Sequence, residues 1–105
     1  MKLFDLGLRF VSHSVFTVLG YNEVIHILHR HANGDWGNVY DELAEHNVTA
    51  IESDDYIMSV YYVCESICVI VITDCFRFHT RVLLSTDASP SRGGKIDYCL
   101  IPSTF

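Results

Sequence analysis

Histidines are the residues of this chain whose type and spacing most directly suggest a chemistry. His26 and His29 would lie one turn apart on a helix, where two imidazoles could hold a zinc ion, and His31 follows closely. A zinc site needs four well-placed ligands, and His46 or a cysteine would have to complete it, but no cysteine spacing points there. We therefore expect surface or partly buried histidines, with no metal and no other cofactor.

Cysteines offer a second chemistry, because Cys64 and Cys68 flank a predicted hairpin and could approach each other. No pair of cysteines has a Cys-x-x-Cys spacing. Asp5 and Arg9 interrupt the apolar N-terminus, which does not have the pattern of a signal peptide, and the apolar run 67–73 is too short to cross a membrane. We expect a cytoplasmic protein without a membrane partner, in which the cysteines are reduced thiols.

Paired carboxylates are the third candidate, since Glu45 has helical neighbour spacing to both Asp41 and Glu42. Such a pair could serve as a general acid and base. The chain offers no accompanying oxyanion or nucleophile motif, and no glycine-rich loop that could cradle a phosphate. A solvated helix face explains these residues better, and we expect the protein not to be an enzyme.

Charge is distributed unevenly along the chain, whose formal net charge is −6. No lysine or arginine lies between Arg30 and Arg77, whereas many carboxylates do. They are Asp35, Asp41, Glu42, Glu45, Glu52, Asp54, Asp55, Glu65 and Asp74. The folded protein should therefore present one strongly negative surface that attracts cations or basic protein surfaces.

This acidic stretch has two interpretations. A soluble protein needs surface charge, and helix surfaces carry it. Alternatively, the carboxylates form a ridge that imitates phosphates or docks on the Lys/Arg channel of a nuclease, while nearby aromatic side chains slow dissociation. The candidate partner-binding residues are Asp35, Trp36, Tyr40, Asp41, Glu42, Glu45, Glu52, Asp54, Asp55 and Tyr56.

Direct nucleic-acid binding is disfavoured by the negative net charge, because phosphate contacts dominate the affinity for DNA and RNA. A weaker hypothesis is a small basic edge accompanied by two tyrosines that could stack on bases. Its residues would be Arg77, Arg81, Arg92, Lys95, Tyr61 and Tyr62.

The elements that position these residues belong to one domain, and its first half has the pattern of a short strand followed by helices. Alternation of Leu6, Leu8 and Phe10 with other residues predicts a strand that ends near Ser12. A short helix should begin there, capped by Ser12 or by the next serine, and end at Gly20.

Two further helices should follow. Asn22 is the candidate N-cap of the first, which would run to Gly34. Its residues at helical spacing are Val24, Ile25 and Leu28, with His29 as a further candidate. The second would span 38–46, with its acids facing water. Its residues expected to face the core are Val39 and Leu43, with Tyr40 as a further candidate.

The second half has period-two patterning with many β-branched and aromatic residues, which predicts strands near 56–63, 67–74 and 77–85. Short linkers favour antiparallel hairpins, and a fourth extended segment spans 96–101. We expect an α+β domain, residues 1–87, in which a short N-terminal strand and two or three short helices pack on an antiparallel β-meander of three to four strands. Residues 88–105 would form a C-terminal extension that could add a strand.

The segment between the two longer helices has the most specific local sequence, His-Ala-Asn-Gly-Asp-Trp-Gly at 31–37. Gly34 can end a helix in the left-handed conformation, and Asp35 can accept hydrogen bonds from the next backbone amides. Trp36 can pin the corner to the sheet, and Gly37 allows close backbone approach. The corner is either architectural or, if Trp36 and Asp35 are exposed, a recognition hot spot.

At this corner the chain resembles a family of small proteins encoded on plasmids, integrative elements and phage-like islands, often labelled type I restriction endonuclease subunit M. The family pattern is a strand, helices, a His-x-x-Gly-Asp-Trp-Gly corner and a meander. The resemblance spans about residues 4–87, and its other matching segments are Phe-Asp-Leu-Gly at 4–7, Ser-Val-Tyr at 59–61, Ile-Thr-Asp at 72–74, Arg77 and Val-Leu-Leu at 82–84.

The chain departs from the family pattern at Asn38, where an aspartate is common, and it lacks the common tryptophan of the middle strand. It also lacks the glycine motif and the Asn-Pro-Pro-Tyr-type motif of a modification methyltransferase. The resemblance therefore implies a mobile-element setting, where small acidic proteins often disable host nucleases.

Charge and resemblance together predict a non-enzymatic inhibitor, an anti-CRISPR or anti-restriction protein. It would bind a host CRISPR-Cas or restriction effector through its acidic surface and block nucleic-acid binding. The alternative is an accessory regulatory or structural interaction module of the element, which could be a homodimer formed through an edge strand.

Overall fold

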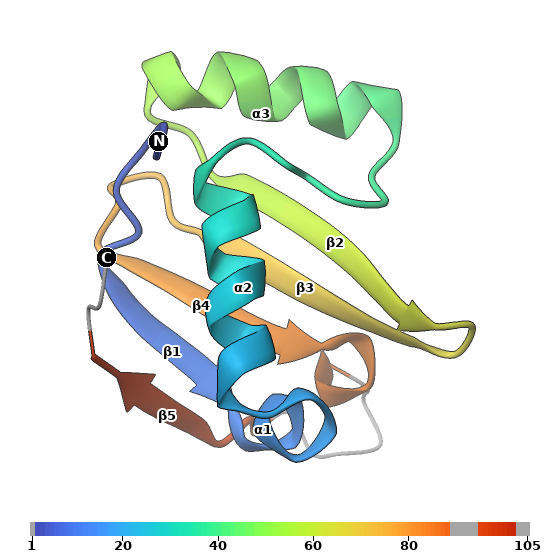
Figure 1. Ribbon diagram of the computed structural model, residues 1–105. Coiled ribbons are helices and arrows are strands. Elements are labelled where there is room, and N and C mark those ends of the chain that lie inside the picture. Colours follow the sequence, from blue (N-terminus) through green and yellow to red (C-terminus); the bar gives the residue numbers. More distant parts are fainter. Residues whose placement is uncertain (1, 89–94, 103–105) are drawn as a thin grey trace.

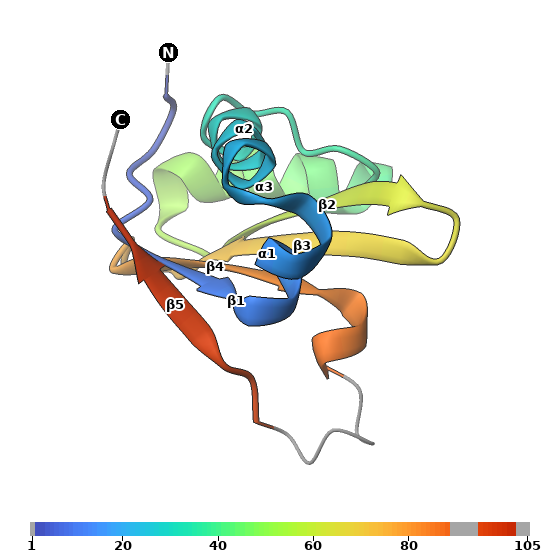
Figure 2. The ribbon, with the colours of Figure 1, turned by 60° about the horizontal axis from the view of Figure 1, so that its bottom comes forward.

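Helices cover one face of a five-stranded sheet in the computed structural model, which describes residues 2–88 and 95–102 (Figure 1, Figure 2). In chain order the elements are β1 (Leu8–Ser12), α1 (His13–Leu19), α2 (Tyr21–Ala32), α3 (Asp41–Ser53), β2 (Ile57–Cys64), β3 (Ile67–Thr73), β4 (His79–Leu84), the 3-10 helix η1 (Ser85–Ala88) and β5 (Tyr98–Ile101). The predicted α+β class is confirmed.

The strand order β2-β3-β4-β1-β5 differs from the predicted arrangement. The antiparallel meander of β2, β3 and β4 is confirmed, but β1 is not a separate strand. It enters the sheet beside β4 in parallel, and β5 pairs antiparallel with its other side. Hydrophobic alternation specifies that a segment is extended but not its neighbour, so the sequence did not predict that β1 and β5 extend the meander into a mixed five-stranded sheet.

Two details of β1 follow from its place in the sheet. Arg9 is buried at 4% exposure, whereas Leu8 is 57% exposed. Gly7 has a φ of +66°, and a Cβ there would lie 2.3 Å from the carbonyl oxygen of Phe78. This close approach lets the N–H of Leu8 donate to that oxygen at 2.9 Å. The parallel pairing thereby sets which side chains of β1 face the helices.

The helix boundaries are partly as predicted. Ser12 caps α1, where its hydroxyl accepts a hydrogen bond from the Val15 N–H, and Gly20 ends that helix with a φ of 80°. The predicted cap of the next helix at Asn22 was wrong, because the same Gly20 is the N-cap of α2. Inside α2, His31 is buried and His29 is exposed, so the predicted core position of His29 was wrong as well.

Helix α3 begins three residues later and ends seven residues later than the predicted 38–46. Its last turns hold three β-branched residues, whose helix propensity is low. Tertiary contacts outweigh that propensity, since the core buries Ala50 in this part of the helix. Tyr40 precedes the helix as its N-cap and is 85% exposed, so its predicted core position was wrong.

The hydrophobic core lies between the helices and the sheet. Val11, Val71 and Val82 are fully buried neighbours on three adjacent strands, and Val24 and Leu28 of α2 belong to the same cluster. Figure 2 shows α2 and α3 above this face of the sheet. The core thus fixes α2 on the sheet and leaves one long side of α3 in solvent.

Candidate functional site

Four carboxylates lie on α3, and we call Asp41, Glu42, Glu45 and Glu52 the acidic stripe. All four are exposed. Asp41, Glu45 and Glu52 follow the spacing i, i+4, i+11, which places them within about 40° of one another around a helix of 3.6 residues per turn. Glu42 lies at the flank of this line. The stripe runs roughly 16 Å along the helix axis at 1.5 Å per residue.

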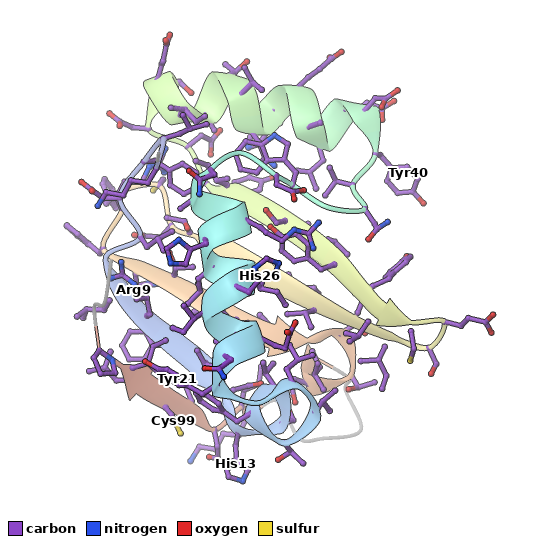
Figure 3. All side chains as sticks on the ribbon, in the orientation of Figure 1. Arg9, His13, Tyr21, His26, Tyr40 and Cys99 are labelled. Atoms are coloured by element: carbon purple, nitrogen blue, oxygen red, sulfur yellow. The ribbon has the colours of Figure 1, made fainter. Side chains whose placement is uncertain are left out.

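The opposite side of α3 faces the sheet, which explains why the stripe points outward. Asn47 and Ala50 are its buried residues. The side-chain amide of Asn47 donates to the carbonyl oxygen of Met58 at 2.8 Å, and its oxygen accepts from the Met58 N–H at 3.1 Å. This two-way contact fixes the rotation of α3, and Figure 3 shows side chains of α3 projecting away from the sheet (Figure 3).

The stripe is not neutralised by ion pairs. Across the described ranges 2–88 and 95–102, the ion pairs are Lys2 with Asp5 and Arg30 with Asp35. None of these includes a carboxylate of α3. The predicted concentration of uncompensated charge on one flank therefore holds for Asp41, Glu42, Glu45 and Glu52.

A cation does lie at the far end of the helix. The Arg77 guanidinium donates to the carbonyl oxygens of Ala50 and Asp55, both at 2.6 Å, and to that of Asp74 at 2.9 Å. It therefore compensates the negative end of the α3 dipole. Asp54 and Asp55 extend the acidic surface here, but the nearby guanidinium offsets part of their field. The most strongly negative region is consequently the N-terminal half of α3.

A shallow groove of about 490 Å³ lies beside the stripe. It is lined by Trp36 from the preceding loop and by Ala44, Glu45, Val48 and Thr49 of α3. Val48 is 62% exposed and lies between two carboxylates of the stripe at helical spacing. Trp36 and Glu45 were predicted as partner-binding residues, but Val48 and Thr49 were missed because the predicted helix ended before them, although the i, i+3, i+7 spacing from Glu45 would have placed Val48.

The predicted aromatic residues Tyr40 and Tyr56 lie at opposite ends of α3. Tyr40 is the N-cap residue and extends into solvent (Figure 3). Tyr56 stacks on His46 with ring centroids 4.4 Å apart, and a ring nitrogen of His46 lies 3.0 Å from the Tyr56 carbonyl oxygen. Only Tyr40 therefore adjoins the strongly negative half of the helix.

Asp35 and Trp36 belong to the corner rather than to the stripe. Two oxygens of Asp35 accept hydrogen bonds from Arg30, at 2.6 and 3.2 Å, and these bonds hold the pKa of Asp35 below its usual value. The Trp36 ring stacks on Phe4 at 6.2 Å between centroids and meets His31 edge-on. The structure favours the architectural interpretation of the corner. The other side of the Trp36 ring lines the groove.

The rest of the corner docks on the edge of β2. The Val60 N–H donates to the Trp36 carbonyl oxygen at 3.1 Å, and the Asn38 N–H donates to the Val60 carbonyl oxygen at 2.6 Å. Gly37 has a φ of +73°, and a Cβ there would lie 2.3 Å from the same Val60 oxygen. A glycine is required at Gly37 because both the dihedral angle and the contact exclude a side chain.

No protein family, curated protein or solved structure matched the chain. Among the described residues, no helix is both long and apolar enough to cross a membrane.

The other predicted constellations are dispersed. Within the described part of the chain, no three His, Cys, Asp or Glu side chains are placed to hold a metal ion. His26 and His29 are exposed, whereas His31 faces the core, and all four cysteines are free. Tyr61 is buried and Tyr62 is exposed, so they do not form one stacking platform. Of the predicted basic edge, Arg81 is partly buried and Lys95 is exposed, and Arg92 lies outside the described residues.

Proposed function

We propose that the protein is a non-enzymatic inhibitor that docks its acidic stripe on a basic, nucleic-acid-binding surface of an effector protein. The observation that supports this proposal is the line of exposed carboxylates on α3 without ion-pair partners among the described residues. Uncompensated charge destabilises a fold slightly through like-charge repulsion, so its concentration on one helix face is better explained by a partner.

The dimensions of the stripe suit a surface built to hold nucleic acid. Duplex DNA places one phosphate per about 3.4 Å of axis on each strand, so a stripe of roughly 16 Å spans about five phosphates of one strand. Asp41 and Glu45 are separated by about 6 Å along the axis. Lysines and arginines arranged to contact a phosphate backbone would therefore meet a carboxylate at about every second phosphate position from Asp41 to Glu45, and Glu52 lies about three positions further on.

Apolar contacts beside the stripe would supply slow dissociation. Val48 and one side of Trp36 line the groove, and Tyr40 lies exposed next to the first carboxylate. Steered association by charge speeds capture, while desolvated aromatic and aliphatic contacts lower the dissociation rate. We propose that the partner is a CRISPR-Cas or restriction effector in the cytoplasm, because the chain resembles mobile-element proteins.

A charge-matched pair of variants tests this proposal. The stripe variant carries Asp41→Asn, Glu45→Gln and Glu52→Gln. The control variant carries Glu23→Gln, Glu65→Gln and Asp97→Asn, which are exposed residues outside α3. Both variants change the net charge by the same amount, so any difference between them reports the position of the charges rather than their sum.

The measurement is displacement of labelled duplex DNA from a Cas9–guide complex and from a type I restriction endonuclease. The wild-type chain should displace DNA from at least one of them. The stripe variant should do so about 10- to 100-fold less well, at roughly 0.5–1 kcal/mol per exposed charge pair. Equal displacement by both variants would remove the stripe from the mechanism, and no displacement from any nucleic-acid-targeting effector would overturn the proposed class.

A further inference from the structure

The sheet face opposite the helices carries a high proportion of apolar side chains, and we call it the open face. Its central row follows the strand register from β2 to β5 and consists of Met58, Ile72, Arg81, Phe10 and Leu100. Because neighbours in register point to the same face, these five side chains form one continuous row. Arg81 is the single charged member of the row.

A second row reinforces this pattern. Val60, Ile70 and Leu83 are register neighbours on β2, β3 and β4. Half-solvated antiparallel sheets normally alternate apolar residues toward the core with polar residues toward water. Here, seven of the eight positions in the two rows are apolar. Figure 2 shows α2 and α3 on the other side of the sheet, so within the described residues no long helix covers this face. Leu83, close to η1, is nevertheless only 6% exposed, so the accessible part of the face consists of the other six apolar members.

We propose that the open face is covered by the open face of a second copy of this chain. Neither row contains an acidic residue, whereas the acidic stripe lies in the helix layer on the other side of the sheet. Two copies can therefore meet through their sheets while their like charges point outward. This arrangement keeps the large negative surfaces apart, which association through the helices would not.

Pairing through the β2 edge is not available as an alternative. The backbone groups of Met58 already bond to Asn47, and those of Val60 bond to Trp36 and Asn38. An edge whose N–H and C=O groups are occupied cannot accept another strand. Self-association through the β2 edge of the sheet is therefore blocked.

The dimensions of the open face fit a dimer of modest affinity. Five strands at about 4.8 Å spacing, each roughly 20 Å long, give a face of about 500 Å² before side-chain relief is counted. Specific weak interfaces bury up to about 600 Å² per partner, and two sheets can pack face to face at about 10 Å with a small rotation. The dimer should therefore form in the micromolar range or weaker.

The position of Arg81 allows a second, independent test of the proposal. It is the middle member of the central row, and its Nε has no hydrogen-bond partner among the described residues. This Nε is already buried, and covering the row would remove the remaining water from the rest of the guanidinium, which disfavours association. Replacement of Arg81 by an apolar residue should consequently tighten the dimer rather than weaken it.

Sedimentation velocity of the full chain between 5 and roughly 500 µM tests the proposal, a range that brackets micromolar affinity. The wild-type chain should dimerise, Arg81→Leu should lower the dissociation constant at least about tenfold, and Ile72→Asp should remain monomeric. Val18→Asp is the matched control, because Val18 is exposed on α1, and it should dimerise like the wild type.

Folding of each variant is checked by circular dichroism and by fluorescence of the single tryptophan. If Ile72→Asp does not fold, Leu100→Asp replaces it, because Leu100 is 58% exposed and its loss leaves no cavity. A wild-type chain that is monomeric throughout, or a dimer that survives both aspartate variants, would overturn the inference. The outcome is independent of the proposed inhibitor function, since no residue of the stripe is changed.

Discussion

His31 shows at the scale of one residue why the corner sequence is structural. Its two ring nitrogens meet the hydroxyls of Ser59 and Thr73 inside the core, and Thr73 continues through Thr80 to a carbonyl oxygen of the N-terminal segment. Burial, with a smaller contribution from the Arg77 charge, lowers the pKa of His31 to about 3. The imidazole is therefore neutral in the folded protein at any physiological pH.

This neutral imidazole predicts a loss of stability in mild acid. The pKa of His31 is about 3 when folded and 6.5 at its ordinary value, so below pH 6.5 the unfolded chain binds a proton that the folded chain does not. The free energy of unfolding should fall by about 2–3 kcal/mol between pH 7.5 and pH 4.5. Urea unfolding followed by Trp36 fluorescence measures it.

The matched variant is His31→Gln, which keeps hydrogen-bonding capacity but cannot titrate. It should be less stable at neutral pH and should lose most of the pH dependence above pH 4.5. Asp35 and Asp74 also have lowered pKa values, but their contribution is lost mainly below pH 4 and does not interfere. The same pH slope in wild type and variant would contradict a buried neutral His31.

At the scale of elements, α3 is held to the rest of the molecule by a few polar contacts and a small apolar side. Asn47 bonds both backbone groups of Met58, and Arg77 bonds the carbonyl oxygen of Ala50. These contacts occur in the part of the helix that propensity alone does not support. The position of the acidic stripe therefore depends on Asn47 and Arg77, which are not part of the stripe.

Replacement of Asn47 tests this dependence. Asn47→Ala removes two hydrogen bonds and leaves both backbone groups of Met58 without their partner, which should lower the free energy of unfolding by about 2–3 kcal/mol. Hydrogen exchange should also increase at the amides of α3 and at Met58. Thr49→Ala, on the exposed side of the same helix, should change stability by less than about 0.5 kcal/mol. Equal effects of the two variants would contradict the proposed anchor.

For the whole molecule, the important feature is that two different surfaces lie on opposite sides of the sheet. The helix side carries the acidic stripe, and the other side is the open face. Charge interactions at exposed sites weaken as salt shortens the screening length, whereas apolar burial does not. The two surfaces should therefore respond to salt in different ways.

Raising sodium chloride from about 50 to 500 mM shortens the Debye length from roughly 14 to 4 Å. Displacement of DNA from an effector by the stripe should weaken at least about tenfold over this range, beyond the effect of salt on DNA binding itself. The dissociation constant of the dimer should change less than about twofold, or decrease. Parallel titration and sedimentation measure both, and a dimer that dissociates in salt would contradict an apolar interface.

The sequence by itself determined the class of fold and most local elements, because these follow from periodicity and capping within a few residues. The β2–β3–β4 meander, the Ser12 cap and the stop at Gly20 were predicted in this way. The exposure of Asp41, Glu42 and Glu45 was also predicted, since a helix face follows from spacing.

Tertiary structure decided what depends on contacts between distant segments. Three features depend on a partner more than twenty residues away or on the whole sheet. They are the parallel pairing of β1 with β4, the burial of Arg9 and His31, and the extension of α3 through Glu52. Local patterns do not encode such partners. For the same reason, the sequence indicated an acidic stretch, but only the rotation of α3 against β2 aligned its carboxylates and separated them from the open face.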